Sequence, residues 1–435
     1  MTDTPTPPLR RWGGLIAAVL LVCGGVGVAV RDRERAEQAQ AARTAVSSAE
    51  IDLEQRADAV DSILARRSAA VMAVDEEMFV ADVDPTAKGL VARQKLLFAN
   101  LVNVGLAELT YQRRDAQFDQ AVVDRHGPTA YLVRVWMTYR IKGIDPVPVK
   151  TELGYTFVRR GTRWVLVDDD DLDAGLTQGA HREPWDVANL EIHRGKRVLV
   201  LVDRGRTGLG QTLVQEAEEA LANVNKFWPR TWSRAVLVIA VKDPRVRGAD
   251  FTGNDSDSAA SSTGTYSTLP GEVTKDGTFA GAYVVINPKQ FAQADEIVLS
   301  HEFTHVATAR LGGYEPLWLA EGTAEYVTWK GIEEISGPDE VAQWESDVQR
   351  QALPRMTALP PDEGFYDTGE DVYGVSWLAV RYLVRDLGID KVATLYEHLA
   401  KDGWNPQERA GDMHLYAGLS EADLFDALKT YDPSR

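Results

Sequence analysis

The chain has 435 residues, enough for two or three domains, and its 44% hydrophobic and 26% charged residues are ordinary for a globular protein. Its formal net charge of -18 argues against nucleic acid as the main partner, because phosphate binding requires a basic face. Cys23 is the only cysteine, so an intrachain disulfide framework and a cysteine-rich zinc module are both excluded.

Residues 13–30, GGLIAAVLLVCGGVGVAV, form an apolar run without a charged side chain. As a helix the run would span about 27 Å, close to the roughly 30 Å of a bilayer core, so it predicts a transmembrane signal anchor. Arginines flank both ends, so the distribution of positive charge hardly decides the orientation. The pattern of an uncleaved signal anchor, with no small-residue cleavage motif after the run, favours residues 1–12 as a short cytoplasmic tail. We therefore expect a single-pass protein of the cell membrane whose remaining chain is extracytoplasmic.

Two other interpretations of the apolar run stay open. Residues 20–23, LLVC, resemble a bacterial lipobox, although Val22 stands where a small residue is expected. The run could also be a buried helix of a soluble domain, but such a helix normally carries a polar face and this run has none.

Beyond the apolar run we expect a stalk and then a small domain. Residues 31–60 are rich in Arg, Glu, Gln and Ala and predict a polar helical stalk. Residues 61–180 predict a small α+β domain, with a strand over 131–142 and a hairpin over 151–168 that turns near Gly161. Alternation along the strand places one set of residues on a single face: Val133, Val135, Met137, Tyr139 and Ile141. Helices followed by an antiparallel sheet resemble the nuclear-transport-factor-like (SnoaL-like) cone fold, which by itself implies no function.

An acidic run near the end of this region, Asp168–Asp171 with Asp173, has two interpretations. Clustered carboxylates suit calcium, but the spacing lacks the alternation and the glycine of a known calcium loop. The spacing favours the other interpretation, a solvated strand end.

A second and larger domain is expected over residues 195–435, after a linker over 181–194. The patterns predict strands at 197–203, 234–241 and 280–287, an amphipathic helix at 210–228, a surface loop at 249–277, and mainly helices after Asp295. The whole chain is therefore expected to belong to the α+β class.

The segment His301–His305 has the HExxH pattern of a metal site. Its two histidines are four positions apart, so on a helix both imidazoles point the same way, one turn apart. Glu302 stands beside them, as in other segments of this pattern. Apolar residues on roughly the opposite side predict that the helix buries one face and turns the other to a cleft.

A second predicted helix, within residues 315–327, carries Glu321 and Glu325 on one face. Catalytic zinc usually takes three protein ligands and leaves one position for water, so Glu321 would complete a His-His-Glu set. Glu325 lies one turn further on and could accept a hydrogen bond from the other ring nitrogen of His301. The alternative is a helix with an acidic solvent-exposed face.

The two segments LSHEFTHVATA and PLWLAEGTAEYV resemble the gluzincin metallopeptidases, specifically the peptidase MA-like domain of bacterial membrane or secreted proteins. The resemblance covers roughly residues 195–430 and is strongest over 297–327. It implies a thermolysin-like half-domain in which a small mixed sheet packs on the active-site helix. It also implies that His301, His305 and Glu321 are zinc ligands. Glu302 would be the catalytic acid/base, and Glu325 the carboxylate behind the ligands.

A later stretch, VYGVSWLAVRYLVRDLG, is similar to a YxxSWxxVRYL helix of the same family. The resemblance implies that Tyr373 reaches the substrate oxyanion, with Tyr366 as a competing candidate and simple packing of Tyr373 as the alternative. For substrate binding we expect the strand Ala280–Val285 to be a sheet edge that pairs with extended peptide. Its proposed contact residues are Ala280, Gly281, Ala282 and Tyr283.

The expected function is a membrane-anchored zinc metallopeptidase with one zinc ion per chain, acting on a peptide or protein. The alternative is a binding or sensing module that acts through the cone-like domain, with an inactive zinc domain. Glu302 argues against this alternative, because a structural zinc site needs no base and usually has four protein ligands.

Overall fold

The computed structural model describes most of the chain beyond the expected membrane segment. It covers residue 40 and residues 54–176, 182–246, 258–268, 278–367 and 369–431. The expected tail (1–12), the expected transmembrane segment (13–30) and most of the expected stalk (31–60) lie outside these ranges. Among the helices of the described ranges, none combines the length and apolar character needed to cross a membrane.

The first part of the described chain combines helices with a four-stranded antiparallel sheet. Residues 58–73 are helical and are followed by α2 (Glu76–Val80) and α3 (Lys88–Val104). The strands pair in sequence order and are β1 (Leu106–Gln117), β2 (Tyr131–Ile141), β3 (Val149–Arg160) and β4 (Arg163–Asp168), with α4 (Gln120–His126) between β1 and β2. The α+β class is therefore confirmed.

Strand alternation places one face of this sheet in the core, as the sequence predicted. In β2 both Tyr131 and Leu132 are buried at its start, and from there on buried and half-buried side chains alternate; the buried ones of this alternating part are Val133, Val135, Met137, Tyr139 and Ile141. The predicted hairpin is confirmed as well, because β3 and β4 pair antiparallel. Gly161 in its turn has φ of 64°, a left-handed conformation that glycine adopts at little cost.

A five-stranded mixed sheet follows in the chain. Its strands, in spatial order, are β5 (Leu190–Arg194), β6 (Val198–Asp203), β7 (Val236–Ala240), β9 (Thr278–Ile286) and β8 (Ala260–Thr268). The three inner strands are parallel, whereas β5 and β8 run antiparallel to their neighbours. Helix α6 (Thr207–Phe227) connects β6 to β7, and α7 (Glu296–Thr308) follows β9.

Both faces of the inner strands are buried, which explains their unbroken apolar runs. In β6, Val198, Val200 and Val202 belong to a core formed with α6, α7 and the C-terminal helices. Leu199 and Leu201 belong instead to the core of the first part of the chain. Strands β7 and β9 alternate in the same way, so this one sheet closes two hydrophobic cores.

Two segments that were predicted to be irregular contribute strands to this sheet. The predicted linker (181–194) contains α5 (Pro184–Val187) and β5, and the predicted loop (249–277) contains β8. These two predictions were wrong because pairing with a neighbouring strand, β6 for β5 and β9 for β8, decides the structure of both segments. The ASSTGTYST sequence of β8 is polar and holds a glycine, but pairing with β9 along its length outweighs those local preferences.

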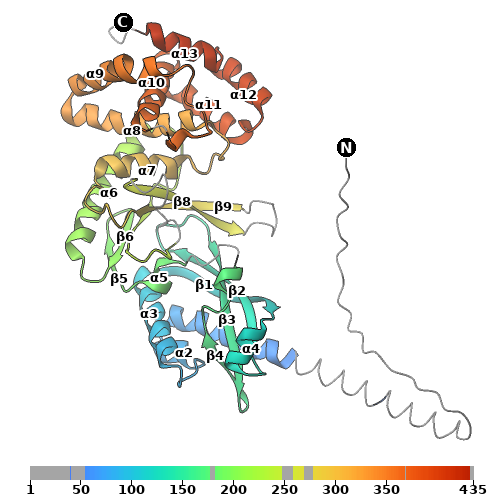
Figure 1. The fold of residues 1–435 in the computed structure, drawn as a ribbon. Helices are drawn as coiled ribbons and strands as arrows, with labels where there is room; N and C mark the ends of the chain where they lie inside the picture. The colour runs from blue at the N-terminus through green and yellow to red at the C-terminus, as the bar shows by residue number, and fades with distance from the viewer. Residues whose placement is uncertain are drawn as a thin grey trace, which may run out of the picture. The chain divides into compact units, whose positions relative to one another are not determined.

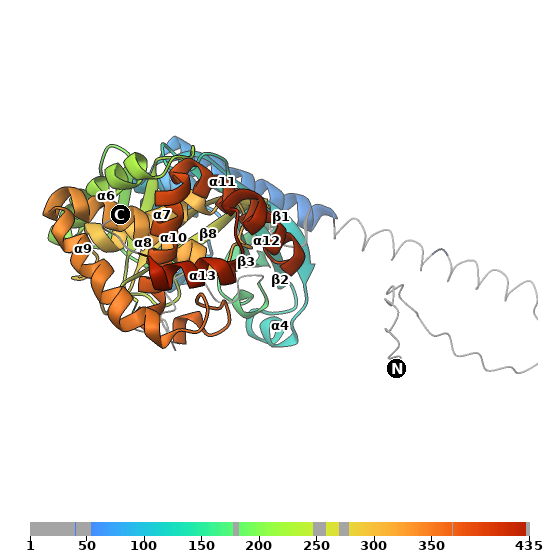
Figure 2. The same ribbon diagram turned by 90° about the horizontal axis from the view of Figure 1, so that it is seen from above.

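The chain after Asp295 is mainly helical, as predicted. The principal helices after α7 are α8 (Leu317–Ser336), α9 (Pro338–Asp347), α10 (Glu370–Leu387), α11 (Ile389–Asp402), α12 (Pro406–Asp412) and α13 (Glu421–Thr430). Figure 1 shows α7 between the five-stranded sheet and these helices, and the view from above in Figure 2 shows the helices gathered over it. Helix α7 is therefore held from two sides.

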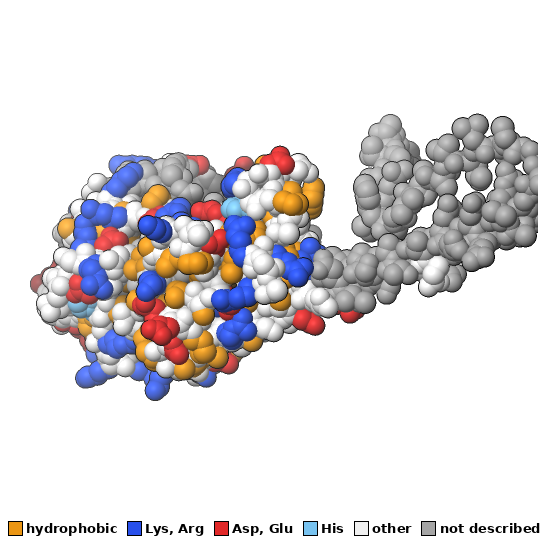
Figure 3. Space-filling view, turned by 90° about the horizontal axis from the view of Figure 1, so that it is seen from below, with side chains coloured by type: hydrophobic (Ala, Val, Ile, Leu, Met, Phe, Trp, Pro, Cys, Tyr) orange, Lys and Arg blue, Asp and Glu red, His pale blue; other side chains and the backbone are white. Residues whose placement is uncertain are grey.

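Charges of both signs are mixed on the face drawn in Figure 3, where Lys and Arg stand beside Asp and Glu. In the described chain some carboxylates are paired with arginines, for example Asp82 with Arg66 and Asp84 with Arg160, at N–O distances of 2.6 and 3.1 Å. This face is therefore neither uniformly basic nor uniformly acidic, and the net charge of -18 is not concentrated on it.

Helices α8 and α10 approach each other closely at Gly322. A Cβ atom on Gly322 would lie 2.3 Å from the backbone oxygen of Ser376 and 2.9 Å from Cγ2 of Val380. Backbone atoms of a packed helix cannot turn aside as the end of a long side chain can. Glycine at this position therefore sets the distance between the two helices.

We expect Gly322→Ala to lower the free energy of unfolding by about 1–3 kcal/mol, because the added methyl group overpacks this crossing. Chemical denaturation of the full chain measures the effect. Gly411→Ala in α12 is the matched control, since a Cβ there meets nothing within 4 Å, and it should leave stability unchanged or raise it slightly. Equal effects of the two substitutions would contradict the close crossing.

Candidate metal centre

Helix α7 carries the HExxH segment and is fixed at its start by Asp295, whose side chain accepts a hydrogen bond of 3.0 Å from the Val298 amide. Its apolar residues lie in the core that α7 shares with α6 and the C-terminal helices; these are Leu299, Phe303, Val306 and Ala307. The side chains of His301, Glu302 and His305 line a cavity of about 550 Å³ on the other side. The predicted division of the helix into a core face and a cleft face is confirmed.

Helix α8 brings Glu321 to the two histidines. The helix begins after Pro316, and its first free amide, on Leu317, donates a 2.7 Å hydrogen bond to Oδ1 of Asp362. Glu321 follows one turn later and is only 5% exposed. The structure therefore places the carboxylate from α8 directly against the imidazoles from α7.

Three donor atoms meet at this point. Nε2 of His301 lies 3.1 Å from Nε2 of His305 and 3.1 Å from Oε2 of Glu321, and Nε2 of His305 lies 3.4 Å from the same oxygen. Zinc bonds of about 2.0–2.1 Å in a tetrahedral arrangement put neighbouring donor atoms about 3.3 Å apart. The three side chains therefore fit three corners of a tetrahedral zinc site, and all three line the cavity.

The ring orientation of His301 is set by Glu325, as the sequence predicted. Nδ1 of His301 donates to Oε1 of Glu325 at 3.0 Å, and Oε2 of Glu325 accepts a hydrogen bond from the Trp329 indole at 3.1 Å. With its proton on Nδ1, a neutral His301 turns the lone pair of Nε2 toward the Glu321 carboxylate. Two electron-rich atoms at 3.1 Å repel each other unless a proton or a metal ion stands between them. The donor set therefore fits a bound metal ion.

The electrostatics of the site point the same way. Burial lowers the pKa of His301, but its hydrogen bonds to Glu321 and Glu325 outweigh that effect and raise the pKa well above its usual value. Burial raises the pKa of Glu321, but the two histidines outweigh it and bring the pKa below its usual range. The centre thus concentrates carboxylate charge around two imidazoles, an environment that a divalent cation neutralises.

Glu302 lies beside the three donor atoms and faces strand β8. Burial raises the pKa of Glu302, while the two histidines and a backbone hydrogen bond from Ser262 oppose the increase. Ser262 belongs to β8, so this strand touches the carboxylate that the sequence predicted to be the acid/base. The sequence prediction missed Ser262, because its segment was taken for a loop.

Both candidate tyrosines line the same cavity. The hydroxyl of Tyr366 donates a 2.9 Å hydrogen bond to Oε1 of Glu321. The ring of Tyr373, on α10, has its centroid 6.3 Å from that of His301 and 5.4 Å from that of Phe365. Tyr366 is thus held by a predicted metal ligand, whereas the ring of Tyr373 is tilted by 57° against the His301 ring.

The predicted substrate strand has to be corrected. The strand that contains Ala280–Val285 is β9, and it lies between β7 and β8 rather than at an edge. Ala280 and Tyr283 are buried in the core, and none of the four predicted contact residues, Ala280, Gly281, Ala282 and Tyr283, is among those lining the cavity. The outermost strand on this side of the sheet, among the described strands, is β8. The cavity is lined by β8 residues such as Ser261 and Tyr266 instead.

The acidic run of the first part already has partners. Oδ1 of Asp168 accepts hydrogen bonds from the amides of Asp170 and Asp171, at 2.8 and 2.9 Å. Asp169 pairs with Arg93 at 2.6 Å, and Gln94 donates to its other carboxylate oxygen at 2.6 Å. His126, Asp168 and Asp171 could together approach a metal ion, but these contacts favour a strand end. It is not wholly solvated as predicted, because Asp169 is buried.

No protein-family model matches the chain, and a search of curated proteins finds no significant match.

Glu325→Gln is expected to weaken zinc binding by about 10- to 100-fold, because it weakens the hydrogen bond that orients His301. Titration of the metal-free full chain with zinc, against a competing chelator, measures this affinity. Glu334→Gln is the control, since Glu334 stands on the same helix but pairs with Lys226 at the surface. If both variants bind zinc as the wild type does, Glu325 has no role in orienting the site.

Proposed function

We propose that the chain is a zinc-dependent peptidase whose centre is formed by His301, His305 and Glu321. The observation that carries the proposal is the set of three donor atoms, 3.1–3.4 Å apart, on the wall of a cavity of about 550 Å³. A structural zinc site is normally closed by four protein ligands, whereas a catalytic site leaves one position open. Three ligands at an open cavity therefore favour catalysis.

A zinc ion held by these residues would lower the pKa of a bound water to about 7 and polarise the peptide carbonyl group. Glu302 is assigned the proton transfers, because it stands beside the ligands and faces the same cavity. It takes a proton from the attacking water and delivers that proton to the leaving amine nitrogen. Glu325 takes no part in the proton transfer and keeps the His301 ring in place through its 3.0 Å hydrogen bond.

The substrate is assigned to strand β8. Because β8 is an outer strand that also lines the cavity, an extended polypeptide can pair with its free edge and present a peptide bond to Glu302. Tyr266 of β8 and Phe279 of β9 pack edge to face, with ring centroids 6.3 Å apart, and give this side of the cavity an apolar wall.

Finer features of the architecture belong to the same proposal. A mixed sheet packed on the helix that bears the site is what a thermolysin-like half-domain requires, and the helices with β1–β4 are what a cone-like domain requires. The apolar run over residues 13–30 is proposed as a single-pass anchor, on its sequence alone. It would place the site outside the cytoplasm.

Glu302→Gln tests the central assignment. We expect the full chain and this variant each to bind about one zinc ion, and only the variant to lose peptide hydrolysis, by about 10²- to 10⁴-fold. Metal analysis and digestion of a denatured protein measure the two properties. A wild type that binds no zinc would refute the metal centre. Zinc binding by both with hydrolysis by neither would support the inactive binding module.

Two parallel substitutions distinguish the roles of Tyr366 and Tyr373. If Tyr373 donates to the substrate oxyanion, Tyr373→Phe should lower kcat by about 10²- to 10³-fold with little change in zinc content. Tyr366→Phe removes a hydrogen bond to Glu321 and should chiefly change zinc affinity. The reverse pattern would assign the oxyanion to Tyr366.

A further inference from the structure

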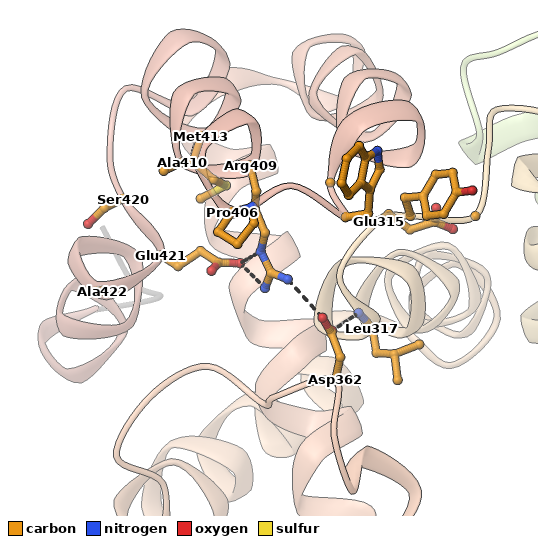
Figure 4. Close-up of a pocket in the computed structure, with 14 residues that line it drawn as sticks. Glu315, Leu317, Asp362, Pro406, Arg409, Ala410, Met413, Ser420, Glu421 and Ala422 are labelled. Carbon is orange, nitrogen blue, oxygen red and sulfur yellow. Dashed lines mark hydrogen bonds and ion pairs between the residues drawn. The ribbon is translucent and has the colours of Figure 1, made fainter. Parts of the chain in front are cut away.

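A second cavity adjoins the one at the metal centre. It has a volume of about 780 Å³ and lies among the loop before α8, the end of α11, and helices α12 and α13. Glu315 and Leu317 line both cavities, so they form a shared wall. Figure 4 shows Glu315 and Leu317 on one side of it and Ser420 and Glu421 on the other. A polypeptide bound at the metal centre can therefore reach this cavity with a neighbouring side chain.

The loop that carries Glu315 is held against α11. The amides of Gly313 and Tyr314 both donate to the backbone oxygen of Ala400, at 3.1 Å each. Gly312 has φ of 153°, and a Cβ atom there would lie 1.9 Å from the same oxygen. This close approach fixes the loop, and with it the position of the Glu315 carboxylate.

The cavity carries an excess of negative charge. Its charged lining residues are Glu315, Asp362, Glu421 and Arg409, three carboxylates against one guanidinium, which gives a formal charge of -2. Arg409 is already engaged, because it donates to Oδ2 of Asp362 at 2.9 Å and to Oε1 of Glu421 at 2.6 Å. Figure 4 shows both contacts, through which Arg409 of α12 joins Asp362, in a loop, to Glu421 of α13, so the guanidinium is already paired with two carboxylates.

Glu315 is the carboxylate without a cationic partner. Its Oε1 accepts a hydrogen bond of 2.8 Å from the hydroxyl of Tyr396, while its Oε2 is buried and has no hydrogen-bond partner among the described residues. A carboxylate withdrawn from water is weakly screened, so its charge acts strongly on a nearby cation. The aromatic rings of Trp404 and Tyr314, which are 68% and 50% exposed, line the same cavity. Such rings attract cations to their faces.

We propose that this cavity is a specificity pocket that receives a cationic side chain, arginine or lysine, of the substrate polypeptide. The inference rests on the proposed peptidase function and names its substrate class. An acidic side chain would meet a formal charge of -2, and an apolar side chain would leave Glu315 unpaired. A long basic side chain suits both the aromatic rings and the carboxylate, because its methylene groups contact the rings and its charge approaches Glu315.

Peptide binding without turnover tests the pocket directly. The full chain with Glu302→Gln is loaded with zinc and titrated with octapeptides in which one arginine is moved along an otherwise uncharged sequence. Each peptide has a matched form with citrulline, which keeps the shape and removes the charge. At one position the arginine peptide should bind about tenfold more tightly. Equal binding of arginine and citrulline peptides at every position would overturn the proposal.

Three further substitutions in the same background locate the effect. Glu315→Gln should abolish the preference for arginine, and Trp404→Ala, at a largely exposed side chain whose loss should not impair folding, should weaken it. Glu408→Gln is the matched control, since Glu408 is exposed on α12 but does not line the cavity, and it should keep the preference. A preference that persists in Glu315→Gln would place the cation elsewhere and contradict the proposal.

Cleavage by the wild-type chain separates this inference from the function on which it rests. In a digest of a denatured protein, arginine or lysine should be enriched at one fixed position relative to the cleaved bonds. Cleavage without such enrichment would overturn the pocket and leave the peptidase proposal intact. Arginine-dependent binding without any cleavage by the wild type would support the pocket and overturn the peptidase proposal.

Discussion

The contact on which the site depends is the meeting of α7 and α8 at two imidazoles and two carboxylates. Each imidazole costs free energy to bury, and so does each carboxylate, unless they face one another or a shared cation. His301 alone contacts Glu321 through one ring nitrogen and Glu325 through the other. Both helices must therefore keep their relative position. The apolar face of α7 holds that helix in the core, and the close approach at Gly322 holds α8 against α10.

Much of this centre could be predicted from the sequence because its signals are local. The spacing of His301 and His305, and of Glu321 and Glu325, follows from the period of a helix, and helices keep that period wherever they pack. The alternation in β2 was equally local, and its buried face was predicted residue by residue. The contact of Glu325 with the second ring nitrogen of His301 was also predicted, because a histidine that binds a metal commonly donates its other N–H to a carboxylate.

The missed features depend on contacts between distant parts of the chain. Strand β8 has a polar, loop-like composition and becomes a strand through its pairing with β9, and no local pattern revealed that β9 would lie inside the sheet. The same holds for Glu315, whose significance arises from Tyr396, eighty-one residues later. Strand order and tertiary packing decide these positions, and the periodicity of a single segment predicts neither of them.

The two-faced sheet also affects how the molecule can be divided. Leu199, Leu201, Leu237 and Ile239 complete the core of the first part of the chain although they belong to the second. A fragment cut in the segment 181–194 would separate the two parts and present this apolar surface to water, where it favours association with other exposed apolar surfaces. The first part of the chain and the five-stranded sheet therefore share one interior. A polar substitution on either side of that interior would expose apolar surface on both.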